Sequence, residues 1–206
     1  MERITLAKLN QQAKKNLLLE NFEVLKKDPI KHEEQLAEII EKMIGSLHEL
    51  DLGFDMLNWA LLNNSKCIQF RGLLCELSEN NPAKVAEFLR GIEVKMALRK
   101  MYAFGNNEDV SYGCMSYGIG YLYAKPIVYL FSQNEYAEAF DLFDYAFNYY
   151  NSGHRFELIK AIIDYVNFDM HNEVQESATE MILSFIEKIE SKEERSILIT
   201  KMIDLM

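Results

Sequence analysis

Apolar residues recur at intervals of three and four along nearly the whole chain of 206 residues. This spacing places them on one face of an α-helix and leaves polar residues on the other face. The clearest stripe has Glu38, Glu41 and Lys42 outside it. Its members are Leu36, Ile39, Ile40, Met43, Ile44, Leu47 and Leu50. Because no segment alternates with the period of two that a half-buried strand shows, the sequence predicts an all-α protein.

Helix starts are indicated by capping residues. Asn81 precedes Pro82, and Asp28 precedes Pro29, so each pair offers a side-chain acceptor followed by the residue favoured at the first helical position. Ser191 has the spacing of a capping box with the acid three residues later. We therefore expect helices to begin after these residues.

Helix ends are indicated by glycines. Gly53, Gly105 and Gly153 lie where apolar stripes run out, which predicts left-handed C-terminal caps. Together the signals predict ten helices, at residues 4–26, 30–50, 54–62, 66–79, 82–103, 109–131, 135–151, 155–168, 173–190 and 192–204.

Short connections between successive helices favour antiparallel neighbours. We expect about ten antiparallel helices stacked as helical hairpins, either as a short α-solenoid or as an irregular helical bundle. The chain has 9 glycines and 3 prolines, and no stretch resembles a flexible linker. The sequence therefore predicts one all-helical domain over residues 1–206.

The composition indicates a soluble protein of the cytoplasm. Cys67, Cys75 and Cys114 match no disulfide framework and no zinc motif, so we expect reduced thiols. The first residues lack a secretory signal. The longest nonpolar stretch, residues 117–131, contains Lys125 and is shorter than the ~20 residues of a membrane helix.

The net charge is −10 at pH 7. A negative field repels the phosphates of nucleic acids, which disfavours direct DNA or RNA binding. It attracts basic proteins, although acidic composition also serves solubility alone.

Fifteen of the 24 aromatic residues lie between Tyr102 and Tyr150. Tyrosine offers broad contact area and a hydroxyl group that tolerates partial exposure, so this region predicts a binding surface. Its expected anchors are Tyr117, Tyr121, Tyr145 and Tyr149. The competing interpretation is an aromatic core, in which helical spacing turns Phe131, Phe140, Phe143 and Phe147 inward.

Within this region, small and aromatic residues follow one another at set intervals: Tyr136, Ala139, Phe143 and Ala146. Residues 130–146 thereby resemble the turn and second helix of a tetratricopeptide repeat. The resemblance implies a helical hairpin in which the alanines allow close approach, and a protein-binding role. The preceding helix departs from the family, because Pro126 and Ile127 stand where a large aliphatic residue and then a small one are expected.

No motif indicates catalysis. None of the histidines His32, His48, His154 and His171 follows a glutamate by three residues or belongs to a His-Glu-x-x-His motif. Nothing near the cysteines supplies a base. We expect no catalytic residues, no metal ion and no cofactor.

Three hypotheses follow. The first is a noncatalytic protein-binding or adaptor module that uses the tyrosine-rich helices. The second is an acidic antagonist, such as an immunity protein or a phage-encoded inhibitor, that blocks a basic site on a partner protein. The third is a helical enzyme or small-molecule receptor with a pocket among the tyrosines and Cys114.

Overall fold

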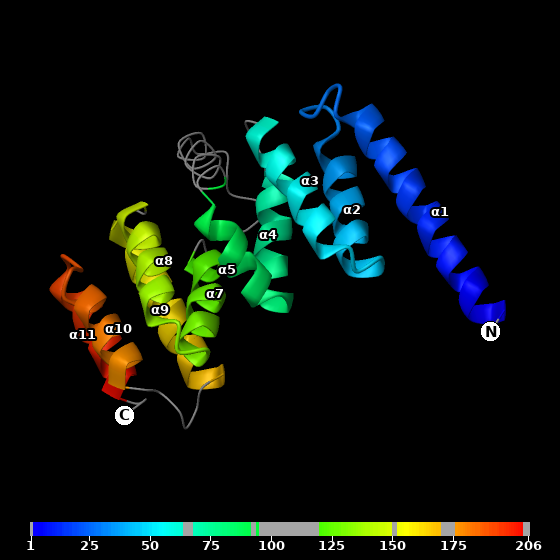
Figure 1. Cartoon of the computed structure of the whole chain (residues 1–206). Coiled ribbons are helices and arrows are strands. Elements are labelled where there is room, and N and C mark those ends of the chain that lie inside the picture. The colour runs from blue at the N-terminus through cyan, green and yellow to red at the C-terminus, as the bar shows by residue number, and fades with distance from the viewer. Residues whose placement is uncertain are drawn as a thin grey trace. The chain divides into compact units, whose positions relative to one another are not determined.

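The computed structural model describes residues 2–63, 68–91, 94, 120–149, 152–169 and 176–203. All regular secondary structure in these residues is helical (Figure 1). The all-α prediction is therefore confirmed. The stacking of the helices as hairpins stays a prediction.

The chain divides into two compact units. The described part of the first consists of residues 2–63, 68–73 and 94, and that of the second consists of residues 74–91, 120–149, 152–169 and 176–203. The prediction of one domain over residues 1–206 is not tested by this division.

The first unit packs its helices in sequence order, α1 against α2 and α2 against α3 (Figure 1). Phe22 of α1 is buried and meets Trp59 of α3 edge to face, with ring centroids 5.6 Å apart. The Lys26 ammonium lies 4.9 Å from the centre of the Trp59 ring. The elements are α1 (Glu2–Leu25), α2 (Glu33–Glu41), the π-helix η1 (Lys42–Ser46), α3 (Leu50–Asn63) and the first half of α4 (Ile68–Asn80).

The single helix predicted at residues 30–50 is wrong, because the backbone changes course twice. Residues 28–32 form turns in which Asp28 accepts a hydrogen bond from the Lys31 amide, so Asp28 does not cap α2. At the other end, α2 passes into the π-helix η1, and His48 takes a left-handed conformation with φ 57°. Leu36, Ile39, Ile40, Met43 and Ile44 are nevertheless all buried, as their spacing predicts.

Gly53 does not cap a helix. It lies inside α3, and its backbone packs so closely on Ile44 that an added Cβ would stand 2.2 Å from Ile44 Cγ1. Gly153 likewise lies in the first turn of α9 rather than at the end of α8. The predicted cap at Gly105 lies outside the described residues.

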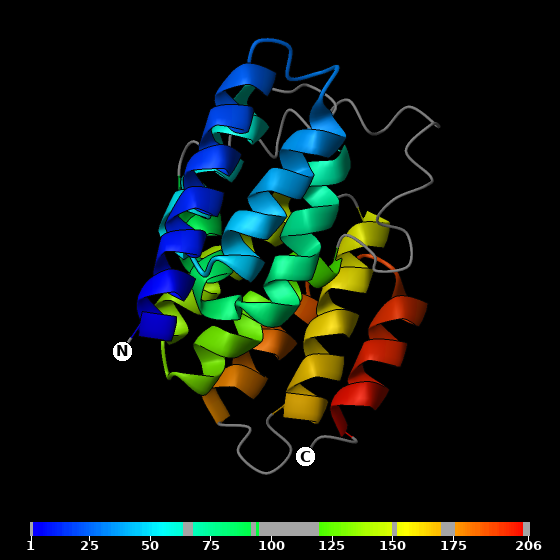
Figure 2. The same ribbon diagram turned by 90° about the vertical axis from the view of Figure 1, so that its right-hand side faces the viewer.

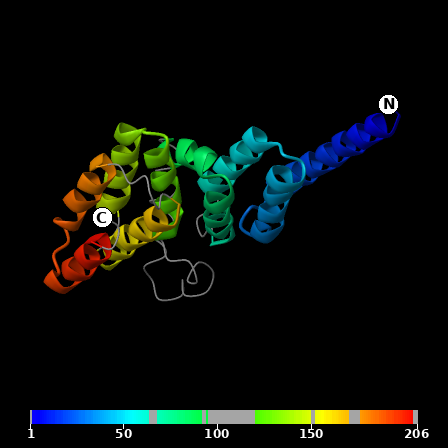
Figure 3. The same ribbon diagram turned by 90° about the horizontal axis from the view of Figure 1, so that it is seen from below.

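The second unit is built around α7, which packs against α5, α8 and α9. Helix α11 lies beside α9, as Figure 2 shows for the yellow and red helices, and α10 packs against α8, α9 and α11 (Figure 3). The elements are α5 (Pro82–Arg90), α7 (Gly120–Ser132), α8 (Tyr136–Tyr149), α9 (Ser152–Asp169), α10 (Glu176–Ile186) and α11 (Lys192–Ile203), with the second half of α4.

Helices α7 and α8 are joined by a tight turn. The Glu135 amide donates to the Leu130 carbonyl at 2.9 Å and the Asn134 amide donates to the Phe131 carbonyl at 3.0 Å, while Asn134 is left-handed with φ 60°. These are the bonds of a Schellman motif, in which asparagine can replace glycine. The turn lets α8 run back along α7.

The residues predicted to form the seam of this pair do face inward. Ala139, Phe143 and Ala146 are completely buried, and Tyr136 is half-buried with its ring 6.2 Å from that of Phe131. Pro126 lies inside α7 and is buried. The burial of these residues is thus as their spacing indicates, and Phe143 turns toward Phe185 of α10.

Other helix ends agree in part with the sequence. Asn81 and Pro82 occupy the N-cap and first helical positions of α5, although Asn81 makes no side-chain cap hydrogen bond. Ser191 Oγ accepts the Glu194 amide at 3.3 Å at the start of α11, as expected. The helix predicted at 82–103 is interrupted after Arg90, because Gly91 is extended with ψ 133°; beyond Gly91 only Val94 of this range lies within the described residues.

Candidate protein-docking surface

Four phenylalanine rings join α8 to α10. Phe185 of α10 stacks on Phe143 with ring centroids 3.8 Å apart and planes at 20°. It also contacts Phe147 at 5.2 Å and Phe140 at 5.7 Å. Such contacts fix the orientation of each ring, because aromatic side chains have few rotamers and large contact areas.

Phe140 is the member of this cluster that reaches the surface. It is 42% exposed, whereas the other three rings are buried. Among the aromatic side chains that the structure describes, Phe140 alone is exposed. A large apolar ring held in place by its neighbours suits a binding anchor, since little conformational freedom is lost on contact.

Lys188 lies over the Phe185 ring of this cluster. Its ammonium lies 4.1 Å from the centre of the Phe185 ring and 3.8 Å from Asp144 Oδ1. Both side chains remain partly exposed, so solvent screens the ion pair and its contribution to stability is small. The pair instead orients Lys188 over the rings.

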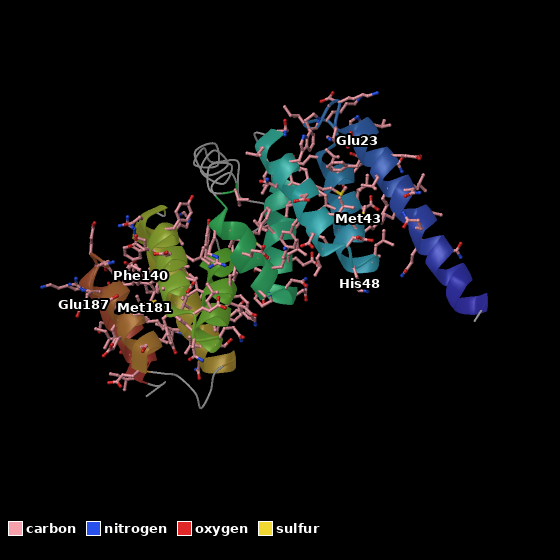
Figure 4. The ribbon with its side chains drawn as sticks, in the orientation of Figure 1. Glu23, Met43, His48, Phe140, Met181 and Glu187 are labelled. Atoms are coloured by element: carbon pink, nitrogen blue, oxygen red, sulfur yellow. The ribbon has the colours of Figure 1, made fainter. Side chains whose placement is uncertain are left out.

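The contacts also set the register of the two helices. Lys188, just after the end of α10, lies by Asp144, and Phe185 lies by Phe143. Met181 lies one turn before Phe185 on α10, and Figure 4 shows Met181 and Phe140 in the same part of the unit. Met181 is half-buried, and we refer to Phe140 and Met181 together as the apolar strip of the α8–α10 junction.

Carboxylates flank this strip on both sides. Residues 135–149 and 176–190 contain eight acidic residues and a single basic one, Lys188. Asp141 is exposed on α8, and Glu180 and Glu187 are exposed on the α10 side. We define the α8–α10 surface as Ala137, Phe140, Asp141 and Asp144 together with Glu180, Met181, Glu187 and Lys188.

The predicted tyrosine anchors are only partly within the described residues. Tyr117 lies outside them, and Tyr121 and Tyr149 belong to α7 and α8 but their side chains are not described. Tyr145 is half-buried on α8, and its ring lies 6.3 Å from that of the buried Tyr123. All four stay predictions as anchors.

The interpretation that turned four phenylalanines inward is wrong for one of them. Phe131, Phe143 and Phe147 are buried, but Phe140 is exposed. A signal for this was present in the sequence: Ala139, Leu142 and Ala146 already define the inner stripe, and Phe140 is rotated from Ala139 by about 100° around the helix. Sequence reasoning missed it because helical spacing alone does not distinguish the centre of a stripe from its edge.

A second cluster lies between α4, α7 and α9 of the same unit. The Tyr165 hydroxyl donates to Glu79 Oε1, and Lys125 Nζ lies 3.8 Å from Glu79 Oε2 and 4.7 Å from the centre of the Tyr165 ring. Each residue comes from a different helix. The cluster therefore links three helices through one carboxylate.

Tyr165→Phe is expected to lower the free energy of unfolding by about 1 kcal/mol, because it removes a hydrogen bond to a partly exposed charged group. Urea denaturation measures the change. In a double-mutant cycle with Glu79→Gln, most of that loss should be coupling between the two residues. Additive losses would show that the contact does not hold the helices together.

The described residues were also compared with the requirements of a metal site, a reactive cysteine and a membrane-spanning helix. No group of three or more metal-ligating side chains occurs there, and Cys75 is a buried thiol. Cys67 and Cys114 lie outside the described residues. None of the helices in these ranges combines the length and apolar content that a bilayer-crossing segment needs.

Comparison of the chain with models of protein families, with curated proteins and with solved structures gives no significant match.

Proposed function

We propose that this protein is a noncatalytic protein-binding module that docks its partner on the α8–α10 surface. The observation that supports this proposal best is the exposure of Phe140 on a base of three buried rings. A single exposed apolar residue is common on protein surfaces. An exposed ring that packs on a buried ring, on helices that carry several exposed charged residues, has the arrangement of a binding hot spot.

A second candidate function is that of an acidic antagonist, which the flanking carboxylates favour. It would use the same surface but cover a basic functional site of its partner. The two differ in outcome, because an antagonist inhibits the activity of the protein it binds whereas an adaptor leaves that activity intact. An activity assay of the identified partner separates them.

Phe140→Ala is expected to weaken partner binding by at least about 2 kcal/mol, since it removes the anchor and leaves the fold in place. Partner retention on the immobilised protein, measured against wild type, tests this expectation. Ile199→Ala is the matched control, because Ile199 lies in α11 of the same unit and is 43% exposed. If the folded Phe140→Ala variant retained as much partner as the wild-type protein, the proposed surface would be contradicted.

A further inference from the structure

We propose that the segment bound on the α8–α10 surface is a lysine- or arginine-rich stretch of a protein that carries one large apolar side chain. This inference rests on the proposed function and adds the chemistry of the partner. It is drawn from two features of the surface, an apolar strip and the carboxylates on either side of it.

The apolar strip explains why we expect a large apolar side chain in the partner segment. Phe140 is exposed at the junction of α8 and α10, with the Phe185 ring 5.7 Å from its own, and the half-buried Met181 lies one turn before Phe185 on α10. Methionine adapts its shape to different apolar groups, while the phenyl ring offers a rigid face. An aliphatic or aromatic side chain of the partner would bury both.

The carboxylates of the α8–α10 surface explain why we expect basic residues in the partner segment. Asp141 lies on the α8 side of the strip and Glu180 on the α10 side, and both are exposed. The one basic residue of these segments, Lys188, is held at the end of the strip, 3.8 Å from Asp144. A positively charged segment therefore meets carboxylates on both sides, whereas an acidic segment or a nucleic acid is repelled.

A second copy of this chain does not match the charge of the α8–α10 surface. A two-fold contact would place the α8–α10 surface against itself, which brings carboxylates opposite carboxylates. Like charges across an interface are unfavourable. The surface thus suits a different, basic protein.

A random-peptide display library selected against the whole protein tests the proposal. We expect the enriched peptides to share a net positive charge and one large apolar residue. Phe140→Ala should reduce their affinity about thirtyfold, the equivalent of losing one anchor of about 2 kcal/mol. Ile199→Ala should leave affinity unchanged.

The contribution of charge is measured with a pair of isosteric double variants. Asp141→Asn with Glu180→Gln should reduce affinity about five- to tenfold, because it removes one carboxylate on each side of the strip. Glu34→Gln with Glu41→Gln changes the net charge equally on exposed positions of α2 and should have no effect. Affinity should also fall as salt concentration rises.

The outcomes distinguish this inference from the function on which it rests. Enriched peptides that depend on Phe140 but are neutral or acidic would overturn the basic partner and leave the docking surface in place. Basic peptides that lose affinity equally in both double variants would also overturn it, since their binding would reflect net charge alone. A library that yields no ligand dependent on Phe140 would contradict the docking surface itself.

Discussion

Phe143→Ala is expected to lower the free energy of unfolding by about 3–5 kcal/mol, the range for removing a buried aromatic side chain. Phe143 is completely buried and stacks on Phe185 at 3.8 Å, so its removal leaves a cavity between α8 and α10. The cavity cannot collapse easily, because Phe185 also contacts Phe140 and Phe147. Urea denaturation followed by circular dichroism measures the loss.

Phe140→Ala is the control for this prediction, since it removes the same ring from the same helix and cluster. The exposed part of Phe140 already contacts water, so the expected loss is only about 1 kcal/mol. Comparable losses in the two variants would show that the exposed ring supports the fold as much as the buried one. That result would indicate that Phe140 stabilises the fold rather than serving as a binding anchor.

Gly53→Val is expected to destabilise the first unit by about 1–3 kcal/mol through overpacking. An added Cβ would stand 2.2 Å from Ile44 Cγ1, and Ile44 is itself buried, so the side chain has little room to move away. The π-helix η1 and α3 would have to separate. Thermal or urea unfolding gives the change in stability.

Gly72→Val provides the matched control for this position. Gly72 also lies within a helix, α4, but a Cβ added there would meet no described atom within 4 Å. Glycine and valine both have low helix propensity, so the expected change is within about 0.5 kcal/mol. If both valines destabilised the protein equally, close packing of Gly53 on Ile44 would not be the cause.

Much of the helical architecture could be predicted from the sequence, because apolar spacing reports which face of a helix is buried. Ala139, Phe143 and Ala146 are buried as predicted, and Ser191 caps α11. These features depend on residues close together in the chain. Local periodicity and capping chemistry are sufficient to predict them.

The breaks in the helices could not be predicted in the same way. Met43 and Ile44 continue the stripe of α2, yet the backbone around them is a π-helix, and Ile44 packs closely on Gly53. Gly91 ends α5 within a sequence that still has helical character. In neither place does the apolar spacing of the segment indicate the break.

The sequence indicated the region of the candidate site but not the residues that form it. Aromatic enrichment between Tyr102 and Tyr150 includes α8, but it favoured tyrosines as anchors and placed Phe140 in the core. Whether a ring at the edge of a stripe is buried depends on the position of the neighbouring helix. Here α10 supports one side of Phe140 and leaves the other side exposed.

The central claim is that the α8–α10 surface receives a partner protein. A photo-crosslinking amino acid at position 137, exposed on α8 within that surface, tests it directly in cells that naturally make the protein. We predict a specific crosslinked partner that disappears with Phe140→Ala and persists with Ile199→Ala. The same crosslinks in the presence of Phe140→Ala, or identical ones from the exposed position 196 on α11, would contradict the account.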